Sequence, residues 1–207
     1  MPPDLDLARG ADGRLRCWWA AGSPLLERYH DQEWARGPRD EHGLFERLSL
    51  EAFQAGLSWR IVLERRPALR AALAGFAPER VARLSEGDIE RAMSDPGVIR
   101  NRAKVEAIVS NARVLVQLHA DGIGLRAVTE EILGDARTTP SAPPLHRTDV
   151  PAHTSASAEL ARRLRALGWR FIGPTTAYAY LQAVGWVDDH LAGCHVRSTE
   201  GPDGPLR

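Results

Sequence analysis

The sequence lacks the features that would place a protein at once in a strongly charged, membrane-embedded or secreted class. Lys and Arg number 27 and Asp and Glu number 27, so the formal net charge is zero. The chain therefore has no overall basic character, and any contact with nucleic acid is confined to a local patch. It also lacks an N-terminal apolar signal segment and the roughly 18 uncharged apolar residues in a row of a membrane-spanning helix. We expect a cytoplasmic protein without a membrane partner.

Cysteine is scarce. Cys17 and Cys194 are the only two cysteines and lie near opposite ends of the chain. In a cytoplasmic protein, two such thiols are more often free, catalytic or metal-bound than joined in a disulfide. The sequence therefore argues against a disulfide bridge between them.

Runs of alternating β-branched residues are missing too, and Ala, Leu, Arg and Glu at helical spacing dominate instead. With 207 residues, 43% of them hydrophobic, the chain suits one globular domain. We predict an all-α fold with a single domain over residues 15–196, flexible tails over 1–14 and 197–207, and a Pro-rich surface loop over 134–153. The predicted helices cover residues 40–55, 58–65, 67–73, 85–93, 102–118, 125–133, 155–167 and 174–185.

Two cysteines and two histidines are candidate ligands of one metal ion. His190 and Cys194 stand at positions i and i+4 and share a face if their segment is helical. Cys17 and His30 are separated by 12 residues, which a loop can bring together. A Cys₂His₂ set suits a structural zinc that would clamp both ends of the chain onto the helical body. Alternatively, the cysteines are small buried apolar residues, and His195 is a rival ligand.

Glu51 lies at the edge of the apolar stripe of the helix predicted over 40–55. Leu44, Leu48, Glu51 and Ala55 follow each other at helical steps. One interpretation is a partly exposed ion pair with Arg47, one turn earlier. The other is a desolvated carboxylate at the wall of a pocket, available to accept hydrogen bonds from a ligand.

Large aromatic residues gather around Glu51 in the sequence, and this favours the pocket. Five of the nine Trp and Tyr residues fall within positions 18–59, namely Trp18, Trp19, Tyr29, Trp34 and Trp59. Packing in the core is the commoner fate of such residues. Aromatic walls with one carboxylate would nevertheless suit a flat cationic ring, bound by stacking, cation–π attraction and a charge-assisted hydrogen bond.

A short basic cluster follows the turn predicted at Asp95-Pro-Gly97. Arg100, Arg102 and Lys104 occur there, with no acidic residue from Pro96 to Val105. A helix–hairpin–helix at this point could offer backbone N–H groups and basic side chains to DNA phosphates. The alternative is a solvated linker, the usual explanation of a charge cluster.

Five segments carry a resemblance to a known family. They are Cys17-Trp-Trp, Tyr29-His-Asp-Gln-Glu-Trp34, Leu50-Glu-Ala-Phe-Gln-Ala-Gly-Leu-Ser-Trp59, Val98-Ile-Arg-Asn-Arg-Ala-Lys104 with Asn111-Ala-Arg113, and Asp189-His-Leu-Ala-Gly-Cys194. In this order, over residues 16–195, they closely resemble the 3-methyladenine DNA glycosylase I family. The second, third and fifth segments together are the most specific to it.

The resemblance implies an all-helical fold of the helix–hairpin–helix glycosylase superfamily. It implies zinc held by Cys17, His30, His190 and Cys194. It also implies that Glu51 contacts the damaged base, that Tyr29 and Trp59 flank this base, and that Trp34 lines the same region.

Some positions depart from the family pattern. Trp18 and Ala35 stand where glycine is usual, Ala52-Phe53 replaces Gly-Gln after the key glutamate, and Ala103 replaces a common glycine in the basic hairpin. The shape of the pocket depends on Trp18 and Phe53, and the approach of the backbone to phosphate depends on Ala103.

The function implied by the resemblance is base excision. We expect a monomeric, monofunctional enzyme that flips N3-methyladenine out of alkylated double-stranded DNA and hydrolyses its N-glycosidic bond, without a nucleotide cofactor. No lysine is placed to form a Schiff base, so strand cleavage is not expected. Two alternatives are a damage-recognition module that flips bases without cutting and a zinc hydrolase of a small substrate.

Overall fold

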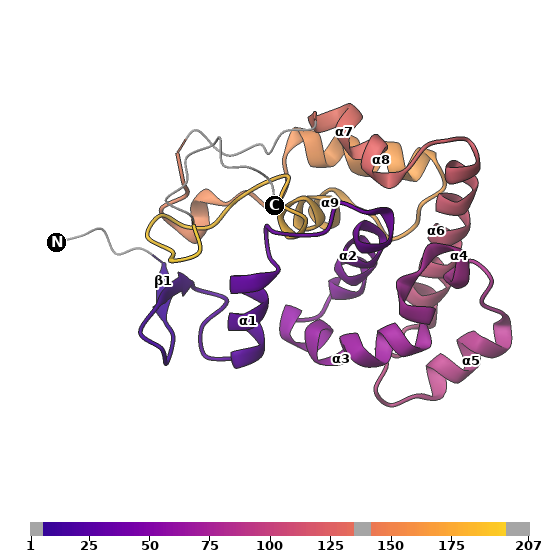
Figure 1. The fold of residues 1–207 in the computed structure, drawn as a ribbon, viewed down its shortest axis with the longest axis horizontal. Helices are drawn as coiled ribbons and strands as arrows, with labels where there is room; N and C mark the ends of the chain where they lie inside the picture. Colours follow the sequence, from indigo (N-terminus) through magenta and orange to yellow (C-terminus); the bar gives the residue numbers. More distant parts are fainter. Residues whose placement is uncertain (1–5, 135–141, 198–207) are drawn as a thin grey trace.

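The structure is a computed structural model that describes residues 6–134 and 142–197, which are mostly helical (Figure 1). Its α-helices are α1 (Pro24–Gln32), α2 (Glu41–Gln54), α3 (Trp59–Ala72), α4 (Pro78–Val81), α5 (Glu86–Ser94), α6 (Arg102–Ala120), α7 (Leu125–Leu133), α8 (Ser155–Ala166) and α9 (Pro174–Ala183). Two short 3₁₀ helices, η1 (Ala74–Phe76) and η2 (Arg147–Asp149), accompany them. The helical fold predicted from the spacing of apolar residues is confirmed for most of the chain.

The N-terminal segment differs from the prediction, because it forms a small β-hairpin. Strand β1 (Leu7–Arg9) pairs antiparallel with β2 (Leu15–Cys17), so the mostly helical fold includes one two-stranded hairpin, whose first strand lies in the segment predicted as a tail. The buried guanidinium of Arg16 forms ion pairs with Asp12 and Asp31, at 2.8 and 2.7 Å. Strands of three residues are too short to show an alternating pattern in the sequence.

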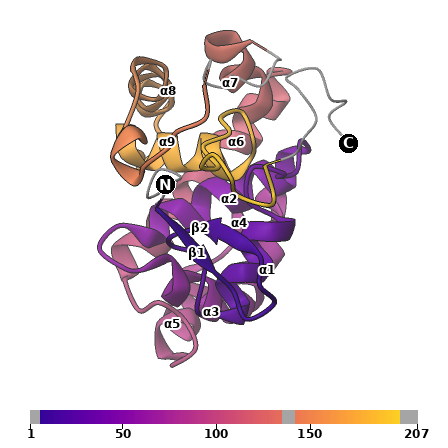
Figure 2. The same cartoon turned by 90° about the vertical axis from the view of Figure 1, so that its left-hand side faces the viewer.

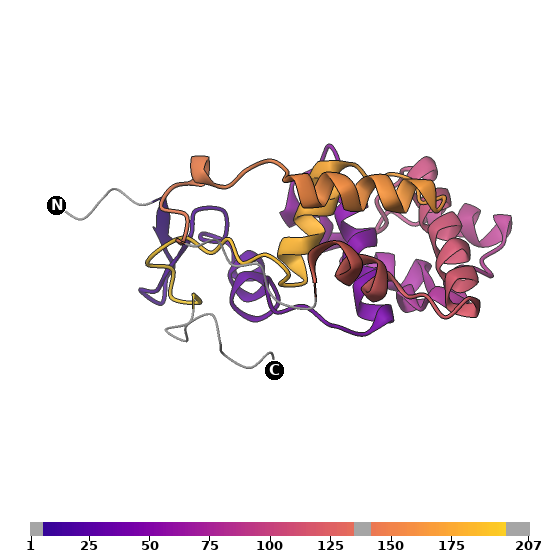
Figure 3. The same cartoon turned by 90° about the horizontal axis from the view of Figure 1, so that it is seen from above.

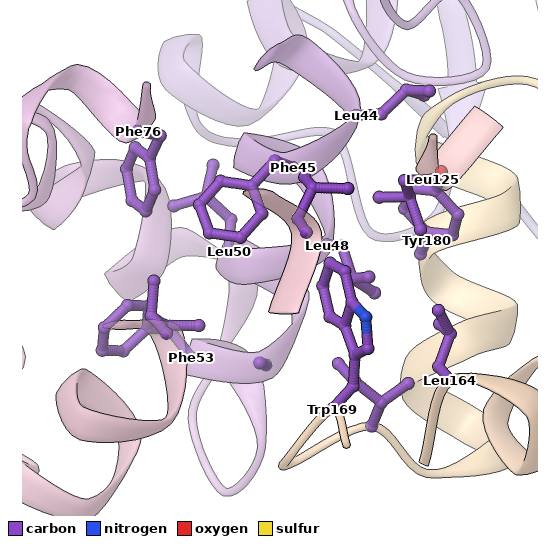
Figure 4. Close-up of a cluster of buried hydrophobic side chains, with 14 of the residues drawn as sticks. Leu44, Phe45, Leu48, Leu50, Phe53, Phe76, Leu125, Leu164, Trp169 and Tyr180 are labelled. Carbon is purple, nitrogen blue, oxygen red and sulfur yellow. The ribbon is translucent and has the colours of Figure 1, made fainter. Parts of the chain in front are cut away.

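Helix α2 runs through the middle of the molecule (Figure 1). All residues from Leu44 to Phe53 are buried, polar ones included. A helix that is buried on every face must be surrounded by other elements, and α2 contacts α3, α6, α7 and α9. Figure 4 shows Phe45 of this helix within the main apolar core, where its ring lies 6.1 Å from that of Trp169.

Helix α3 is one continuous helix, whereas the sequence predicted two with a break before Pro67. Its predicted N-cap, Ser58, is confirmed, because the hydroxyl accepts a hydrogen bond from the backbone N–H of Ile61. Proline removes one helical hydrogen bond and costs about 3 kcal/mol in a helix interior. Burial of Leu63 and Leu69 on either side of Pro67 offsets that cost and keeps the helix intact.

Helix α1 was not predicted. Pro24 occupies its first turn, but only Tyr29 and His30 among its residues are buried. A helix with two buried residues, one of them polar, presents no apolar stripe in the sequence. These two residues belong to the candidate sites described below.

The chain beyond α9 turns back toward the N-terminal hairpin, as Figures 2 and 3 both show. Gly185 makes this turn with φ of +77°, and a Cβ there would lie 2.4 Å from the carbonyl oxygen of Ala35. Only glycine fits this close approach. Farther along, the backbone N–H of His195 donates to Leu15 O at 2.9 Å. Residues near the two ends of the described chain are thereby held together.

Residues 142–153, the described part of the predicted Pro-rich loop, cross between these ends. The backbone N–H of Arg147 donates to the carboxylate of Asp6 at 2.8 Å, and that of Ala192 donates to Pro144 O at 2.9 Å. Residues 135–141 of the loop, and the predicted tail from 198 onward, lie outside the described residues. Among the described helices none is long and apolar enough to span a bilayer. The cytoplasmic location stays a prediction.

Candidate functional site

A pocket of about 460 Å³ lies where α1, α2 and α3 meet α9 and the segment after it. Tyr29, Trp34, Glu51 and Trp59, which the sequence analysis singled out, all line this pocket. The other lining residues are Trp18, Trp19, Leu26, Gln54, Ser58, Arg60, Val150, Ala179, Gln182 and Asp189. A volume of this order accommodates a small flat molecule.

Three helices supply the central residues of the pocket. Tyr29 comes from α1, Glu51 from the last turn of α2, and Trp59 is the first residue of α3. The rings of Tyr29 and Trp59 lie 5.1 Å apart with 56° between their planes. Gly56, with φ of +82°, turns the chain between α2 and α3. These residues are positioned by rigid helices and a short turn.

Glu51 is a buried carboxyl group without a hydrogen-bond partner among the described residues. Its side chain is only 6% exposed. Burial raises the pKa of Glu51 to about 8, and the positive charge of Arg47 opposes this rise. Arg47 itself donates to Glu33 at 2.5 Å rather than to Glu51. The alternative of an exposed Arg47–Glu51 ion pair is therefore wrong.

Two further polar atoms of the pocket residues have no partner. The hydroxyl of Tyr29 and the Nε1 of Trp59 are buried and make no hydrogen bond to any described residue. An unpaired buried polar atom costs free energy, of about 1–3 kcal/mol, unless something pairs with it. Both atoms belong to residues that line the pocket, as Glu51 does.

The residues that depart from the family pattern lie in different environments, and only some of them line the pocket. Trp18 lines the pocket and is 37% exposed, so it changes the wall that a ligand meets. Phe53 is fully buried and belongs to the main core, so its ring does not line the pocket. Ala35 has φ of +58°, a conformation that glycine adopts without strain.

Sequence reasoning missed the polar side of the pocket formed by Asp189 and Gln182. Asp189 Oδ2 accepts hydrogen bonds from Tyr178 at 2.5 Å and from Gln182 Nε2 at 2.6 Å. In the sequence, Asp189 stands out only as the first residue of the segment Asp189-His-Leu-Ala-Gly-Cys194. The spacing of Tyr178 and Gln182, one helical turn apart on α9, was the available signal.

Near the pocket, Cys17, His30 and Cys194 bring their ligand atoms within 4.8 Å of one another. All three residues are buried, and Cys194 Sγ lies 3.4 Å from His30 Nε2. Hydrogen bonding from Cys17 lowers the pKa of the Cys194 thiol. The thiols are unbridged, as predicted.

His190, the fourth predicted ligand, lies beside this group but is not among the three residues whose ligand atoms are within 4.8 Å of one another. Its Nε2 is buried without a partner among the described residues, and its ring centroid lies 4.9 Å from that of His30. The Nδ1 atoms of the two histidines face carboxylates, His30 facing Asp31 at 2.8 Å and His190 facing Asp188 at 2.7 Å. With Nδ1 held in this way, each histidine turns its Nε2 away from the carboxylate: that of His30 faces Cys194 Sγ, and that of His190 has no partner among the described residues. His195 instead contacts Asp31 at 3.1 Å, in a separate group with His30.

The structure contradicts part of the predicted phosphate-binding cluster. Lys104 is buried, and its Nζ donates to the carbonyl oxygens of Phe53 at 2.8 Å and Ala55 at 2.6 Å, so it cannot reach a phosphate. Arg102 forms ion pairs with three glutamates, Glu86, Glu90 and Glu106.

Arg100, in contrast, is an exposed residue of the loop between α5 and α6. The preceding turn is confirmed, with Gly97 N donating to Asp95 Oδ1 at 2.7 Å. Counting charges along the sequence could not distinguish a buried Lys104 from an exposed Arg100. Of the three basic residues, only Arg100 is both exposed and without an ion pair among the described residues, and its contact with phosphate stays a prediction.

The connection between α8 and α9 was not singled out by the sequence analysis. The side chain of Asn111 fixes it, donating to Arg170 O at 3.0 Å and accepting from Arg170 N at 2.8 Å. Phe171, with φ of +58°, is 44% exposed at its tip. Gly173 is the N-cap of α9 and provides no side-chain acceptor for the first-turn N–H groups.

Comparisons with known proteins agree with this geometry. A family model described as methyladenine glycosylase matches residues 19–198. DNA-3-methyladenine glycosylase 1 of Escherichia coli (strain K12) is 39% identical over 179 residues, 86% of this chain and 95% of that protein. DNA-3-methyladenine glycosylase of Haemophilus influenzae is 37% identical over 184 residues, 89% of this chain and 98% of that protein.

Solved structures give the same result. A crystal structure of 3-methyladenine DNA glycosylase I matches with a TM-score of 0.82 and 38% identity, over 87% of this chain and 98% of that chain. A structure concerned with 3-methyladenine recognition by 3-methyladenine DNA glycosylase I from Staphylococcus aureus matches with a TM-score of 0.83 and 29% identity, over 89% and 97%. The chain therefore belongs to the methyladenine glycosylase family.

Proposed function

We propose that this protein is a monofunctional DNA glycosylase that removes 3-methyladenine from alkylated double-stranded DNA. The observation that carries the proposal is an aromatic pocket whose buried Glu51 carboxyl group has no hydrogen-bond partner in the described part of the chain, in a protein of this family. The enzyme flips the damaged nucleotide into the pocket and hydrolyses its N-glycosidic bond, which releases the free base and leaves an abasic site. It acts as a monomer without a nucleotide cofactor.

The chemistry of the substrate explains why a single carboxyl group suffices. Methylation at N3 places a positive charge on the base within the nucleotide, so the base leaves as a neutral molecule. It needs no strong general acid to protonate it. Glu51 acts by binding the cationic base and stabilising its charge in a desolvated site.

Glu51 also provides discrimination against normal adenine. Because its pKa is about 8, the carboxyl group of the empty pocket is mostly protonated at neutral pH. A cationic base that enters the pocket favours the carboxylate and displaces the proton. Normal adenine carries no charge, so it gains no ion pair to offset the desolvation of a carboxylate.

The aromatic residues hold the base. Tyr29 and Trp59 contact its faces, and Trp34 lines the same region. Each contact adds stacking and, for a cationic ring, cation–π attraction. The unpaired hydroxyl of Tyr29 and Nε1 of Trp59 are hydrogen-bond donors for acceptor atoms of the base.

We further propose that Cys17, His30, His190 and Cys194 hold one structural zinc ion. The fit is supported by two thiols, by the unpaired Nε2 of His190, and by the carboxylates behind both histidines. Zinc would join the N-terminal hairpin to the chain beyond α9. Four protein ligands leave no position for a reacting water, which argues against a small-substrate zinc hydrolase.

For the DNA backbone, we assign the helix–hairpin–helix to α8, residues 168–173 and α9. It replaces the hairpin predicted at Asp95–Gly97, because Lys104 is buried and Arg102 is held by three glutamates. First-turn N–H groups of α9 suit a phosphate, because a helix N-terminus carries partial positive charge and Gly173 supplies no competing acceptor. Exposed Arg100 is a second phosphate contact. Such contacts hold DNA without reading its sequence.

Chromatography of the bases released from methylated DNA tests the proposed activity. Release of free 3-methyladenine with an intact, alkali-sensitive strand is the expected result. Tight binding to alkylated DNA without release would instead identify a recognition module that flips bases and does not cut. Strand cleavage without alkali would contradict the monofunctional mechanism.

A further inference from the structure

Arg47 lies directly behind the wall of the pocket. It occupies α2 one turn before Glu51, is 6% exposed, and places its guanidinium carbon 5.5 Å from the ring centroid of Tyr29. Its Nη1 is buried without a hydrogen-bond partner among the described residues. A buried cation that leaves a donor unpaired is expensive, so stability alone does not account for it.

The charge of Arg47 is only partly compensated. Its Nη2 donates to Glu33, but Arg66 shares the same carboxylate oxygen, at 2.7 Å. Arg66 also pairs with Glu46 at 2.8 Å, and Arg70 pairs with the same oxygen of Glu46 at 2.8 Å. This ion-pair network therefore has three guanidinium groups and two carboxylates. The network lines a second cavity together with Asp40 and His42, and within it Arg47 is the member whose guanidinium lies over the ring of Tyr29.

Other charged and titratable groups around Glu51 come from each element of the pocket. Tyr29 of α1 has a pKa raised well above its usual value, first by burial and then by Glu51, so it stays neutral. Arg60 of α3 lines the pocket and pairs with Glu64 at 2.8 Å. Asp189 lines the side formed by α9 and the segment after it, where two donors hold it.

Among these groups, Arg47 is the cation that acts on the Glu51 carboxyl group from its own helix. We propose that Arg47, balanced by Glu33, is a positioning residue that sets the fraction of Glu51 present as carboxylate and thereby the pH range in which the cationic base is bound. The inference rests on the proposed role of Glu51 in the pocket. Arg47 touches neither base nor sugar in this account. It acts through the ionisation of Glu51.

The direction of the effect follows from electrostatics. Removing the cation disfavours the carboxylate, so Arg47→Met raises the pKa of Glu51. Removing the counter-ion strengthens the cation, so Glu33→Gln lowers it. A shift of about one unit is a tenfold change in the carboxylate fraction on the acid side of the titration. Excision at pH 7 would fall about tenfold in Arg47→Met and approach the parent rate above the new pKa.

The experiment combines two readouts in the full-length protein. The Glu51 carboxyl group is titrated by carbon-13 NMR with labelled glutamate and assigned by its loss in Glu51→Gln. Single-turnover release of 3-methyladenine is measured from pH 6 to pH 9.5 at enzyme concentrations well below saturation, where the pH profile reports the free enzyme. We expect the two midpoints to move together, upward in Arg47→Met and downward in Glu33→Gln, with Arg47→Lys close to the parent.

Controls separate the possible failures. Arg70→Met removes a half-exposed arginine from the far end of the same network and should leave both midpoints unchanged. An unmoved carboxyl titration in both Arg47→Met and Glu33→Gln would overturn the inference. If the titration midpoint of Glu51 moves but the pH profile of excision does not, Arg47 does control the ionisation of Glu51. That result would contradict the proposed role of Glu51 in excision.

Discussion

The pocket and the Cys–His cluster both contain buried polar atoms without partners among the described residues. They differ in the volume around these atoms and in whether neighbouring carboxylates hold the side chains in place. The pocket offers about 460 Å³ between helices, and within residues 6–134 and 142–197 nothing forms a hydrogen bond with the Glu51 carboxyl group. In the cluster, the ligand atoms of Cys17, His30 and Cys194 lie within 4.8 Å of one another. Carboxylates hold His30 and His190 from behind. An unpaired atom in a spacious cavity suits an organic ligand, whereas one in a tight, supported cluster suits a single ion.

This difference predicts that the two regions fail in different ways. The cluster joins segments far apart in the sequence, so a change there should affect folding. The pocket is formed by helices that the main core already holds, so a change there should affect excision and leave the fold intact. The first two predictions below each test one side of this contrast, and the next two test the proposed contacts with the DNA backbone.

The largest effect is expected in the cluster. Cys17→Ser or Cys194→Ser should abolish zinc binding and lower the free energy of unfolding by about 5 kcal/mol or more, because the binding energy of a structural metal is also folding energy. Metal analysis and thermal unfolding, with and without a chelator, measure this. His195→Ala is the matched control and should retain the metal. Parent protein that is fully stable without any metal would refute the zinc proposal.

The next effect is a pH-dependent gain of stability in Glu51→Gln. The folded pKa of Glu51, about 8, lies above its unfolded value, so its contribution is complete below about pH 4.5 and is lost as the pH rises through 8. Glutamine does not titrate and should avoid this loss, which amounts to a few kcal/mol. Denaturant unfolding of both proteins from pH 5 to pH 9 tests this. A constant difference across that range would mean that Glu51 is not desolvated.

A smaller effect separates the two basic residues of the predicted phosphate cluster. Lys104→Met should destabilise the protein by about 2–3 kcal/mol, because two carbonyl oxygens near the end of α2 lose a charged donor. Its folded fraction should bind DNA with the parent's salt dependence. Arg100→Ala should leave stability unchanged and reduce the salt slope by about one phosphate contact. If Lys104→Met reduced the salt slope and Arg100→Ala did not, Lys104 rather than Arg100 would be the phosphate contact.

The smallest effect is expected for Gly173→Asp, which should raise the stability of the protein and lower its affinity for DNA. Gly173→Asp places a capping carboxylate at the start of α9, where there is open space for a Cβ, and should stabilise the helix by up to about 1 kcal/mol. The same carboxylate should weaken DNA binding because it competes with phosphate for the first-turn N–H groups. Gly173→Ala is the control, since it adds no charge. If Gly173→Asp binds DNA as tightly as the parent does, α9 does not contact the DNA backbone.

Residue spacing predicted most helices and the lining of the pocket. Ser58 and the Ser85–Asp88 capping box begin helices as expected, because caps are local interactions. The fate of Pro67 could not be predicted, because packing of distant elements decides whether a helix tolerates proline.

Charged residues were harder to interpret than apolar ones. Lys104 and Arg100 look equivalent in the sequence, yet one is bonded to carbonyl oxygens in the interior and the other is exposed. Likewise, Arg47 stands one turn from Glu51 but pairs with Glu33 of another segment. Partners from distant segments decide these cases, and helical periodicity carries no information about them.

The most direct test of the central claim is single-turnover excision of 3-methyladenine by Glu51→Gln, measured beside its thermal unfolding at pH 7. A charge-assisted hydrogen bond is worth about 1.5–3 kcal/mol, so the account predicts a folded variant whose excision is slower by about tenfold to a hundredfold. Its preference for the cationic base over normal adenine should fall as well. A folded variant that excises 3-methyladenine at the parent rate would contradict the account.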